Sequence, residues 1–370
     1  MDSDPMNQDG RTPQPELAVD PRRAAERIGA MFDRLRSVLA RRIVGQDRVV
    51  QEIFVAILAE GHCLLVGVPG LAKTLIVSTI AELLSLRFKR IQFTPDLMPS
   101  DITGATMIAD DAAGSRDFQF LKGPIFANVI LADEINRTPP KTQSALMEAM
   151  EERQVTAGTQ RFPLERPFFV LATQNPIEQE GTYNLPVSQK DRFLFNVLID
   201  YPEAEEEFQI LRQTTSSYRP DMETVIEGPE ILNAIAAARR VEISDRLVDY
   251  ATRIIRRSRP ADPHAPEFVR EWLAWGGGPR AIQALILGAK AHAIISGRIA
   301  VEASDLHRIL APTLRHRIIL NYHAEAEGVD PDSVIERILE SMPDGLYSRP
   351  RVVAKKWTLI DRILHRTGRS

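Results

Sequence analysis

The chain has a single cysteine, Cys63, in 370 residues, which excludes an internal disulfide framework. It has no continuous apolar run of about 18 residues, so the sequence predicts no transmembrane helix. Aromatic residues make up only 6% of the chain, and the formal net charge of -4 shows no excess of basic residues, so nucleic acid is not the expected partner. The first residues lack the basic and apolar segments of a signal peptide, and we therefore expect a cytoplasmic location.

The most informative segment is a glycine-rich turn that follows the apolar run at residues 63–66. Its eight residues are Gly67, Val68, Pro69, Gly70, Leu71, Ala72, Lys73 and Thr74. Such a turn between a strand and a helix directs backbone N–H groups and the positive helix end toward a polyanion. Lys73 is placed to reach the β- and γ-phosphates of a nucleoside triphosphate, and the Thr74 hydroxyl to bind Mg²⁺.

One position of this segment departs from the P-loop consensus, which has glycine where this chain has Ala72. A methyl group there restricts the backbone but removes no N–H group, and Gly67 and Gly70 keep the turn adaptable. The alternative interpretation is an ordinary strand–turn–helix corner with a coincidental Lys-Thr pair.

Short apolar runs alternate with helical patterns in the first part of the chain. A helix is expected to begin near Pro21 and to continue through Leu39. Strands are expected at residues 63–66, 89–93, 128–132, 168–173 and 194–199. Several of these runs are continuously apolar, which is typical of strands buried on both faces of a parallel sheet.

After residue 202 the strand-like runs disappear, and helices are expected at residues 229–240, 244–257, 266–275, 279–297 and 303–317. The predicted fold is therefore α/β, with a parallel sheet sandwiched by helices and followed by an all-helical domain. The expected divisions are a disordered acidic N-terminus at 1–20, an α/β nucleotide-binding core at 21–205, a helical domain at 206–343 and a basic amphipathic tail at 344–370.

Polar side chains follow two of the predicted strands. Asp133 and Glu134 end one apolar run, and Asn175 follows another. Ligands of open α/β sheets bind at the carboxyl ends of strands. There, Asp133 is placed to hold Mg²⁺ through water, Glu134 to polarise an attacking water, and Asn175 to orient it. The alternatives are a pair of solvated acids and a plain turn before Pro176.

Taken together, the motifs resemble the core of an AAA+ ATPase, and more narrowly the MoxR family. The segments that carry the resemblance are Ile43-Val44-Gly45-Gln46, GVPGLAKT at 67–74, LADEINR at 131–137, ATQNP at 172–176, DRFLF at 191–195, Gly278-Pro279-Arg280-Ala281 and LRHRI at 314–318. They occur in family order from about residue 30 to 343, and together they are specific although each is weak alone.

The resemblance implies roles for individual residues. Lys73 and Thr74 would be the Walker A pair, Asp133 and Glu134 the Walker B pair, and Asn175 sensor 1. Val44 and Gly45 would lie near the adenine of ATP. Ala72 agrees with the family, whose P-loops usually carry alanine there.

Two arginines are implied to complete the site. Arg280, which opens a helix after a run of glycines, resembles sensor 2 and would contact the γ-phosphate bound by its own chain. Arg192 resembles the arginine finger that reaches a neighbour's nucleotide. Arginine suits both roles because it stays charged and binds phosphate oxygens with a planar fork. The alternative for Arg192 is a surface ion pair with Asp191.

Two insertions fit the same family. Residues 99–120 would be an insert in the second core helix, and residues 154–162 read as a β-hairpin. In related rings both face the pore or the substrate side, whereas the alternative is a pair of solvated surface hairpins. The basic tail at 344–370 suits a partner protein or a membrane surface, and otherwise a final helix with one solvated face.

The resemblance implies an ATPase that uses ATP and Mg²⁺ and acts as a chaperone or remodelling motor in the maturation of a client protein complex or the insertion of its cofactor. The implied partners are further copies of the chain in a ring, expected to be a hexamer, and a protein with a von Willebrand factor A domain. The client is not named by the sequence. The alternatives are a nucleotide-gated assembly scaffold with slow turnover and a DNA-acting AAA+ motor.

Overall fold

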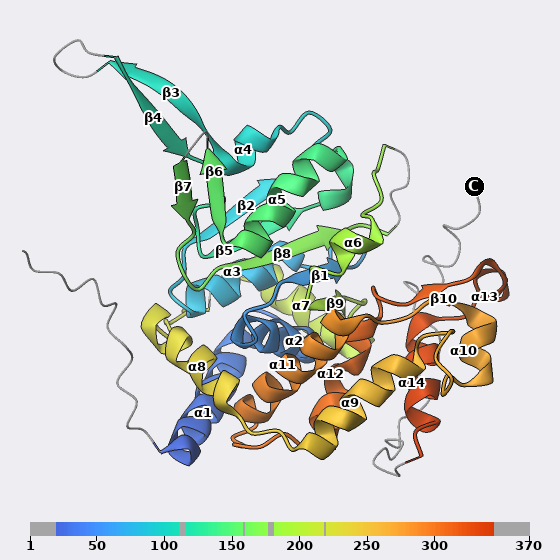
Figure 1. Ribbon diagram of the computed structural model, residues 1–370. Helices are drawn as coiled ribbons and strands as arrows, with labels where there is room; N and C mark the ends of the chain where they lie inside the picture. Colours follow the sequence, from blue (N-terminus) through green and yellow to red (C-terminus); the bar gives the residue numbers. More distant parts are fainter. Residues whose placement is uncertain (1–19, 111–115, 158–159, 177–180, 218–219, 344–370) are drawn as a thin grey trace, which may run out of the picture.

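The computed structural model describes residues 20–110, 116–157, 160–176, 181–217 and 220–343 (Figure 1). The tail at 344–370 and residues 1–19 lie outside the described residues. Asp20 is described, and its side chain accepts a hydrogen bond from the Arg22 N–H at the start of the first helix. Among the described helices, none has both the length and the apolar character that crossing a membrane requires.

A parallel five-stranded sheet forms the centre of the core, and all five expected strands are observed. The strands are β1 (Cys63–Val66), β2 (Phe88–Gln92), β5 (Val129–Asp133), β8 (Phe169–Gln174) and β9 (Phe195–Leu198). Their order across the sheet is β2-β5-β8-β1-β9. In the register of the sheet, Gln92 pairs with Asp133 and Val66 with Gln174, so the carboxyl ends of these strands meet at one edge.

Helices cover both faces of the sheet because the side chains of each strand alternate between two hydrophobic cores. Leu65 belongs to the core that includes α2 (Asp47–Leu58) and α3 (Lys73–Leu83), whereas Leu64 belongs to the core that includes α5 (Pro140–Glu152). Figure 1 shows α5 above the sheet and α2 and α3 below it.

The expected N-terminal helix is α1 (Pro21–Leu39). Its apolar residues are buried at helical spacing, and the ring of Phe32 stacks on that of Phe54 at a centroid distance of 5.1 Å. The helix packs against α8 (Gly228–Arg240) and α11 (Pro279–Ile295) as well as α3, so it ties the helical domain to the core.

Both insertions form antiparallel hairpins. The first follows α4 (Pro99–Thr103) and consists of β3 (Gly104–Asp110) and β4 (Arg116–Lys122), and Figure 1 shows it projecting away from the core. The second consists of β6 (Gln154–Ala157) and β7 (Gln160–Pro163). The two hairpins touch, because the Phe120 ring stacks on the Phe162 ring with centroids 4.3 Å apart and an interplanar angle of 21°.

The C-terminal lid is helical and includes one short antiparallel strand pair. Its elements, besides α8 and α11, are α7 (Ala204–Thr214), α9 (Asp245–Arg257), α10 (Glu267–Trp272), β10 (Leu273–Trp275), α12 (Ala303–Leu314), β11 (Ile319–Leu320), α13 (Tyr322–Glu327) and α14 (Pro331–Glu340). The helix expected at 266–275 ends at Trp272 because the next residues pair with β11. The helix expected at 303–317 ends at Leu314, where the chain turns to bury two arginines.

Candidate functional site

The P-loop connects the carboxyl end of β1 to the start of α3, as the sequence predicts. Gly70 has φ 87° and Ala72 has φ 54°, so the backbone is left-handed at both positions. Lys73 Nζ donates a hydrogen bond to the Gly67 carbonyl at 2.6 Å. No side chain caps the first turn of α3, which leaves its N–H groups directed at the loop. This geometry suits an anion.

Two details show why small residues occupy the loop. A Cβ on Gly67 would lie 2.8 Å from the Ile199 carbonyl oxygen, so a side chain does not fit there. Ala72 adopts the left-handed conformation at a cost of about 1 kcal/mol for a residue with a Cβ. The loop therefore holds a strained backbone where it faces its ligand.

Asp133 and Glu134 lie at the same edge of the sheet as the P-loop, because β5 and β1 are separated only by β8. Arg90 donates two hydrogen bonds to Asp133 Oδ2, at 3.0 Å from Nε and 2.6 Å from Nη2. Thr173 Oγ1 donates to Asp133 Oδ1 at 2.6 Å and accepts from the Glu134 N–H at 2.8 Å. The Asp133 carboxylate thus accepts two bonds from Arg90 and one from Thr173, which leaves one of its roughly four acceptor positions open.

Glu134 is left-handed with φ 58° and is held from two sides. Gln92 Nε2 and Arg137 Nη1 donate to Glu134 Oε2 at 2.7 and 2.9 Å. Strained backbone of this kind concentrates at functional sites. Asn175 is buried and follows β8, between the P-loop strand and the acidic strand, which is the position that the sequence predicts.

Three residues of this site were missed by the sequence reasoning, namely Arg90, Gln92 and Thr173. Two of them lie on β2, and their contact with the acids depends on the strand order, which places β2 beside β5. The signal available in the sequence was a strand with polar side chains near its carboxyl end, but that pattern does not name the neighbouring strand.

Val44 and Gly45 line a cavity of about 140 Å³ together with Leu39, Ile43 and Gln209 of α7. Gln46 Nε2 donates to the Asp200 carbonyl at 3.1 Å, directly after Ile199, which packs against Gly67. The segment that lines the cavity is thus linked through Asp200 and Ile199 to the P-loop, and its contact with adenine stays a prediction.

Arg192 and Arg280 lie together, and both contact one carboxylate. Arg192 Nη2 is 2.9 Å from Glu151 Oε2, and Arg280 Nη2 is 2.8 Å from Glu151 Oε1. The partner of Asp191 is instead Arg317, whose Nε donates to its carboxylate at 2.7 Å. The alternative of an Arg192–Asp191 ion pair is thus not what the structure shows.

The position of Arg280 corrects an expectation. Glu151 lies at the end of α5, where Met150 and Arg153 contact His62 and Glu60, which precede β1. The P-loop follows β1, so the length of a four-residue strand, roughly 13 Å, separates the two places. In this structure Arg280 does not reach the phosphate site of its own chain, because α11 begins at the opposite edge of the sheet.

A buried arginine of the lid fixes the loop that carries Arg192. The Arg317 side chain is only 4% exposed, and its guanidinium donates to the carbonyls of Asp191, Phe193 and Leu194. Burial lowers the pKa of Arg317, while the Asp191 carboxylate opposes that change. The lid therefore positions the core segment from which Arg192 projects.

The start of α5 is attached to the acidic loop. Gln143 is buried, and its Nε2 donates to the carbonyls of Ile135 and Thr138 at 3.1 and 3.0 Å. Ile135 begins the short 3₁₀ helix η1 (Ile135–Arg137), which directly follows Glu134, and Thr138 comes directly after it. One end of α5 therefore contacts the acidic site, and the other end carries Glu151.

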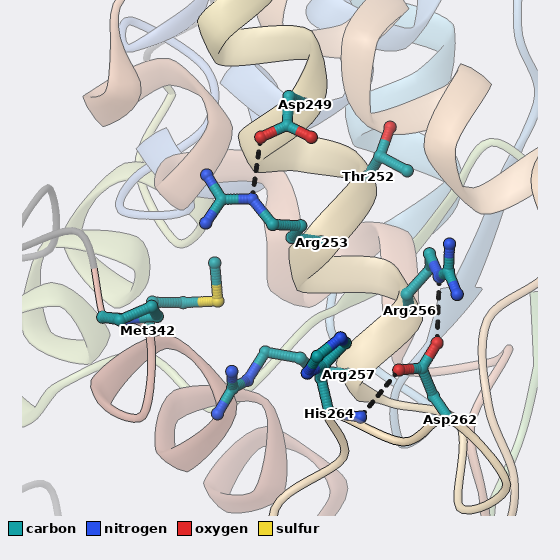
Figure 2. A pocket seen from close by; sticks show the side chains of 9 residues that line it. Asp249, Thr252, Arg253, Arg256, Arg257, Asp262, His264 and Met342 are labelled. Carbon is teal, nitrogen blue, oxygen red and sulfur yellow. Dashed lines mark hydrogen bonds and ion pairs between the residues drawn. The ribbon is translucent and has the colours of Figure 1, made fainter.

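Two larger hollows lie away from the P-loop. A groove of about 650 Å³ is lined by α5, by the β6–β7 hairpin and by α6 (Val187–Lys190), and it includes Glu148, Glu151 and Arg192. A second cavity of about 420 Å³ lies in the lid beside α9, where Figure 2 shows Arg253 bonded to Asp249 and Arg256 to Asp262. Two of its basic side chains are thus paired with acids.

In the described part of the chain, no group of three His, Cys, Asp or Glu side chains could hold a metal ion. Mg²⁺ usually keeps several waters and takes few protein ligands beside substrate phosphates. The half-buried Thr74 hydroxyl and the open acceptor position of Asp133 fit such a nucleotide-borne ion.

Comparisons with known proteins agree with this geometry. Residues 62–195 match the model of the ATPase family associated with various cellular activities (AAA), and residues 267–338 match the AAA lid domain. The chaperone MoxR1 of Mycobacterium tuberculosis is 42% identical over 300 residues, which cover 81% of this chain and 78% of the relative. Protein YeaC of Bacillus subtilis is 39% identical over 301 residues, covering 81% and 90%.

A crystal structure of a candidate ATPase from Cytophaga hutchinsonii is similar to this chain at a TM-score of 0.80 and 39% identity, covering 86% of this chain and 96% of that one. The P-loop, the acid pair and the helical lid define an AAA+ type P-loop fold. Within that class, the chain belongs to the MoxR family.

Proposed function

We propose that this protein hydrolyses ATP in a ring of identical subunits and uses the motion to remodel a client protein. The observation that carries the proposal is the division of the site. The P-loop and the acids lie at one edge of the sheet, whereas Arg192 and Arg280 lie at the other edge. A complete phosphate site then requires a second subunit.

The first half of the site binds and activates. Lys73 and the N–H groups of residues 70–74 hold the β- and γ-phosphates, and Thr74 with Asp133 would hold Mg²⁺. Bound Mg²⁺ neutralises charge on the phosphates. Glu134 polarises the attacking water once it leaves Gln92 and Arg137, and Asn175 orients that water.

The second half of the site comes from the neighbour. Arg192 and Arg280 of one subunit approach the γ-phosphate bound by the next, and they stabilise charge that develops during transfer. An interface in which one face meets a different face closes into a ring when the rotation between subunits divides a full turn, and we propose a ring of six subunits. Arg280 joins the lid to this contact, so a change in the phosphates moves the lid.

The client side is proposed from the two hairpins. They project from the core and contact each other through Phe120 and Phe162, so they move as a unit. The family suggests a client complex that is matured or receives its cofactor, with a von Willebrand factor A domain protein as partner. We further propose that the protein acts in the cytoplasm.

The test is the ATPase rate per chain as a function of protein concentration. We expect the rate to rise with concentration, and Glu134→Gln and Arg192→Ala to abolish most of it, the latter by about 10³-fold. Arg253→Ala is the control, because it removes one lid guanidinium that is paired with Asp249. A rate that stays flat while subunits assemble would contradict the shared site and favour a nucleotide-gated scaffold.

A further inference from the structure

One carboxylate joins the two arginines that the proposed function assigns to the neighbour's nucleotide. Each oxygen of Glu151 contacts a different guanidinium, at 2.9 Å for Arg192 and 2.8 Å for Arg280. Arg192 belongs to the core and Arg280 to the lid. Two like charges are thereby held close together, an arrangement that needs an anion between them. We call this set of three residues the arginine bridge.

The bridge is exposed enough to open. The side chains of Glu151, Arg192 and Arg280 are 41%, 32% and 50% exposed. Exposed ion pairs contribute little to stability, so a multiply charged phosphate can displace the carboxylate. Arg317 gives the contrast, because it is 4% exposed and bonded to several carbonyls, and it stays in place.

We propose that Glu151 is a positioning residue that occupies the place of the neighbour's γ-phosphate in the free subunit. It keeps the two arginines paired and ordered until a neighbour with bound ATP takes them over. Assembly then exchanges one anion for another. This inference rests on the proposed function. It adds that Glu151 competes with the neighbour's γ-phosphate for the two arginines, because the bridge must open before the shared site forms.

The chain offers a matched control for the charge of Glu151. Glu148 lies one turn earlier on α5, is exposed and lines the same groove. In the described residues it makes no ion pair with Arg192 or Arg280, whose carboxylate contacts are with Glu151 and, at 4.0 Å, Asp191. Glu148→Gln therefore removes the same charge from the groove and leaves the bridge intact.

The experiment is sedimentation velocity with Mg²⁺ and the slowly hydrolysed analogue ATPγS, over a range of subunit concentrations. Glu151→Gln is expected to lower the concentration at half-assembly by roughly three- to tenfold relative to Glu148→Gln. Glu151→Asp keeps the charge with a shorter reach, and its midpoint should lie between wild type and Glu151→Gln. Thermal melts of the dilute subunits confirm that all variants fold.

The double variant Arg192→Ala/Arg280→Ala separates the two proposals. If it weakens assembly, and Glu151→Gln no longer strengthens assembly in that background, the bridge acts through the arginines. If it weakens assembly but Glu151→Gln matches Glu148→Gln or raises the midpoint, the bridge proposal is wrong and the shared site stands. If the double variant leaves the concentration at half-assembly unchanged, the arginines are not at the interface and both proposals are wrong.

Discussion

At the scale of single residues, Thr173 organises the acidic end of the site. Its hydroxyl donates to Asp133 and accepts from the Glu134 N–H, so one oxygen fixes both acids. The Thr173 side chain is fully buried, so its hydroxyl makes these bonds away from solvent. The acids are thus aligned before any nucleotide binds.

Thr173→Val keeps the shape of the side chain and removes both hydrogen bonds. We expect the free energy of unfolding to fall by about 1–3 kcal/mol and the ATPase kcat to fall with it, because two buried polar groups lose their partner. Thr313→Val is the control, since that buried hydroxyl donates only within its own helix, to the Ile309 carbonyl. Equal effects of the two substitutions in urea unfolding and in kcat would contradict the organising role.

The residues of the first half-site could be predicted from the sequence because each follows an apolar strand. Lys73, Thr74, Asp133 and Asn175 come after runs whose parallel alignment gathers them at one edge. Arg90 and Thr173 could not be assigned, because their partners depend on strand order. The side on which Arg280 lies depends on how the lid packs, which local sequence does not encode.

At the scale of elements, the two hairpins share one aromatic contact. Phe120 on β4 stacks on Phe162 on β7, and Phe120 also lies edge-on to Phe126. Each hairpin also contacts the core, since Val155 of β6 is buried in the core that includes α5 and Phe120 packs against that core. The stack therefore couples two insertions whose aromatic residues are about 40 residues apart in the sequence.

A double-mutant cycle tests that coupling. Phe120→Ala and Phe162→Ala are expected to lower the free energy of unfolding by amounts that are not additive, with an interaction energy of about 0.5–1.5 kcal/mol. The same cycle with Phe126→Ala in place of Phe162→Ala gives the reference for a contact outside the second hairpin. Additive effects for Phe120 and Phe162 would show that the hairpins are energetically independent.

Element boundaries show where local patterns stop being informative. The apolar spacing of the sequence predicts a helix to residue 275, but Leu273 pairs with Leu320 and the helix ends at Trp272. The second misplaced boundary lies after Leu314, where Arg315 and Arg317 leave the helical path to bond core carbonyls. Both ends are set by tertiary hydrogen bonds, whereas β1, β5 and β8 are set by their own apolar runs.

At the scale of the whole molecule, buried histidines link stability to pH. Burial lowers the pKa of His62 to about 4 and that of His307 to about 4, and it also lowers the pKa of His316. His62 accepts a hydrogen bond from the Val170 N–H, and His316 contacts the Phe193 carbonyl. These rings therefore stay neutral in the folded chain while the unfolded chain takes up protons near its ordinary pKa.

The sign of the effect follows from that difference. Below about pH 6.5 the unfolded state binds more protons, so the free energy of unfolding falls as the pH falls toward 4. His62 alone is expected to contribute a loss of about 2 kcal/mol between pH 7 and pH 5. Urea unfolding at the two pH values measures that share as the difference between wild type and His62→Gln, since His307 and His316 contribute equally to both chains.

The attachment of α5 at both ends has a consequence for timing. Gln143 bonds the start of the helix to the loop after Glu134. Near the other end, Glu151 contacts Arg192 and Arg280, which we propose act on the nucleotide of the next subunit. The helix has 13 residues and is about 20 Å long. In the proposed ring, a shift of one subunit's own acids would be passed directly to the following nucleotide. ATP hydrolysis would then proceed around the ring in one direction, because each subunit would determine when the next subunit hydrolyses its nucleotide.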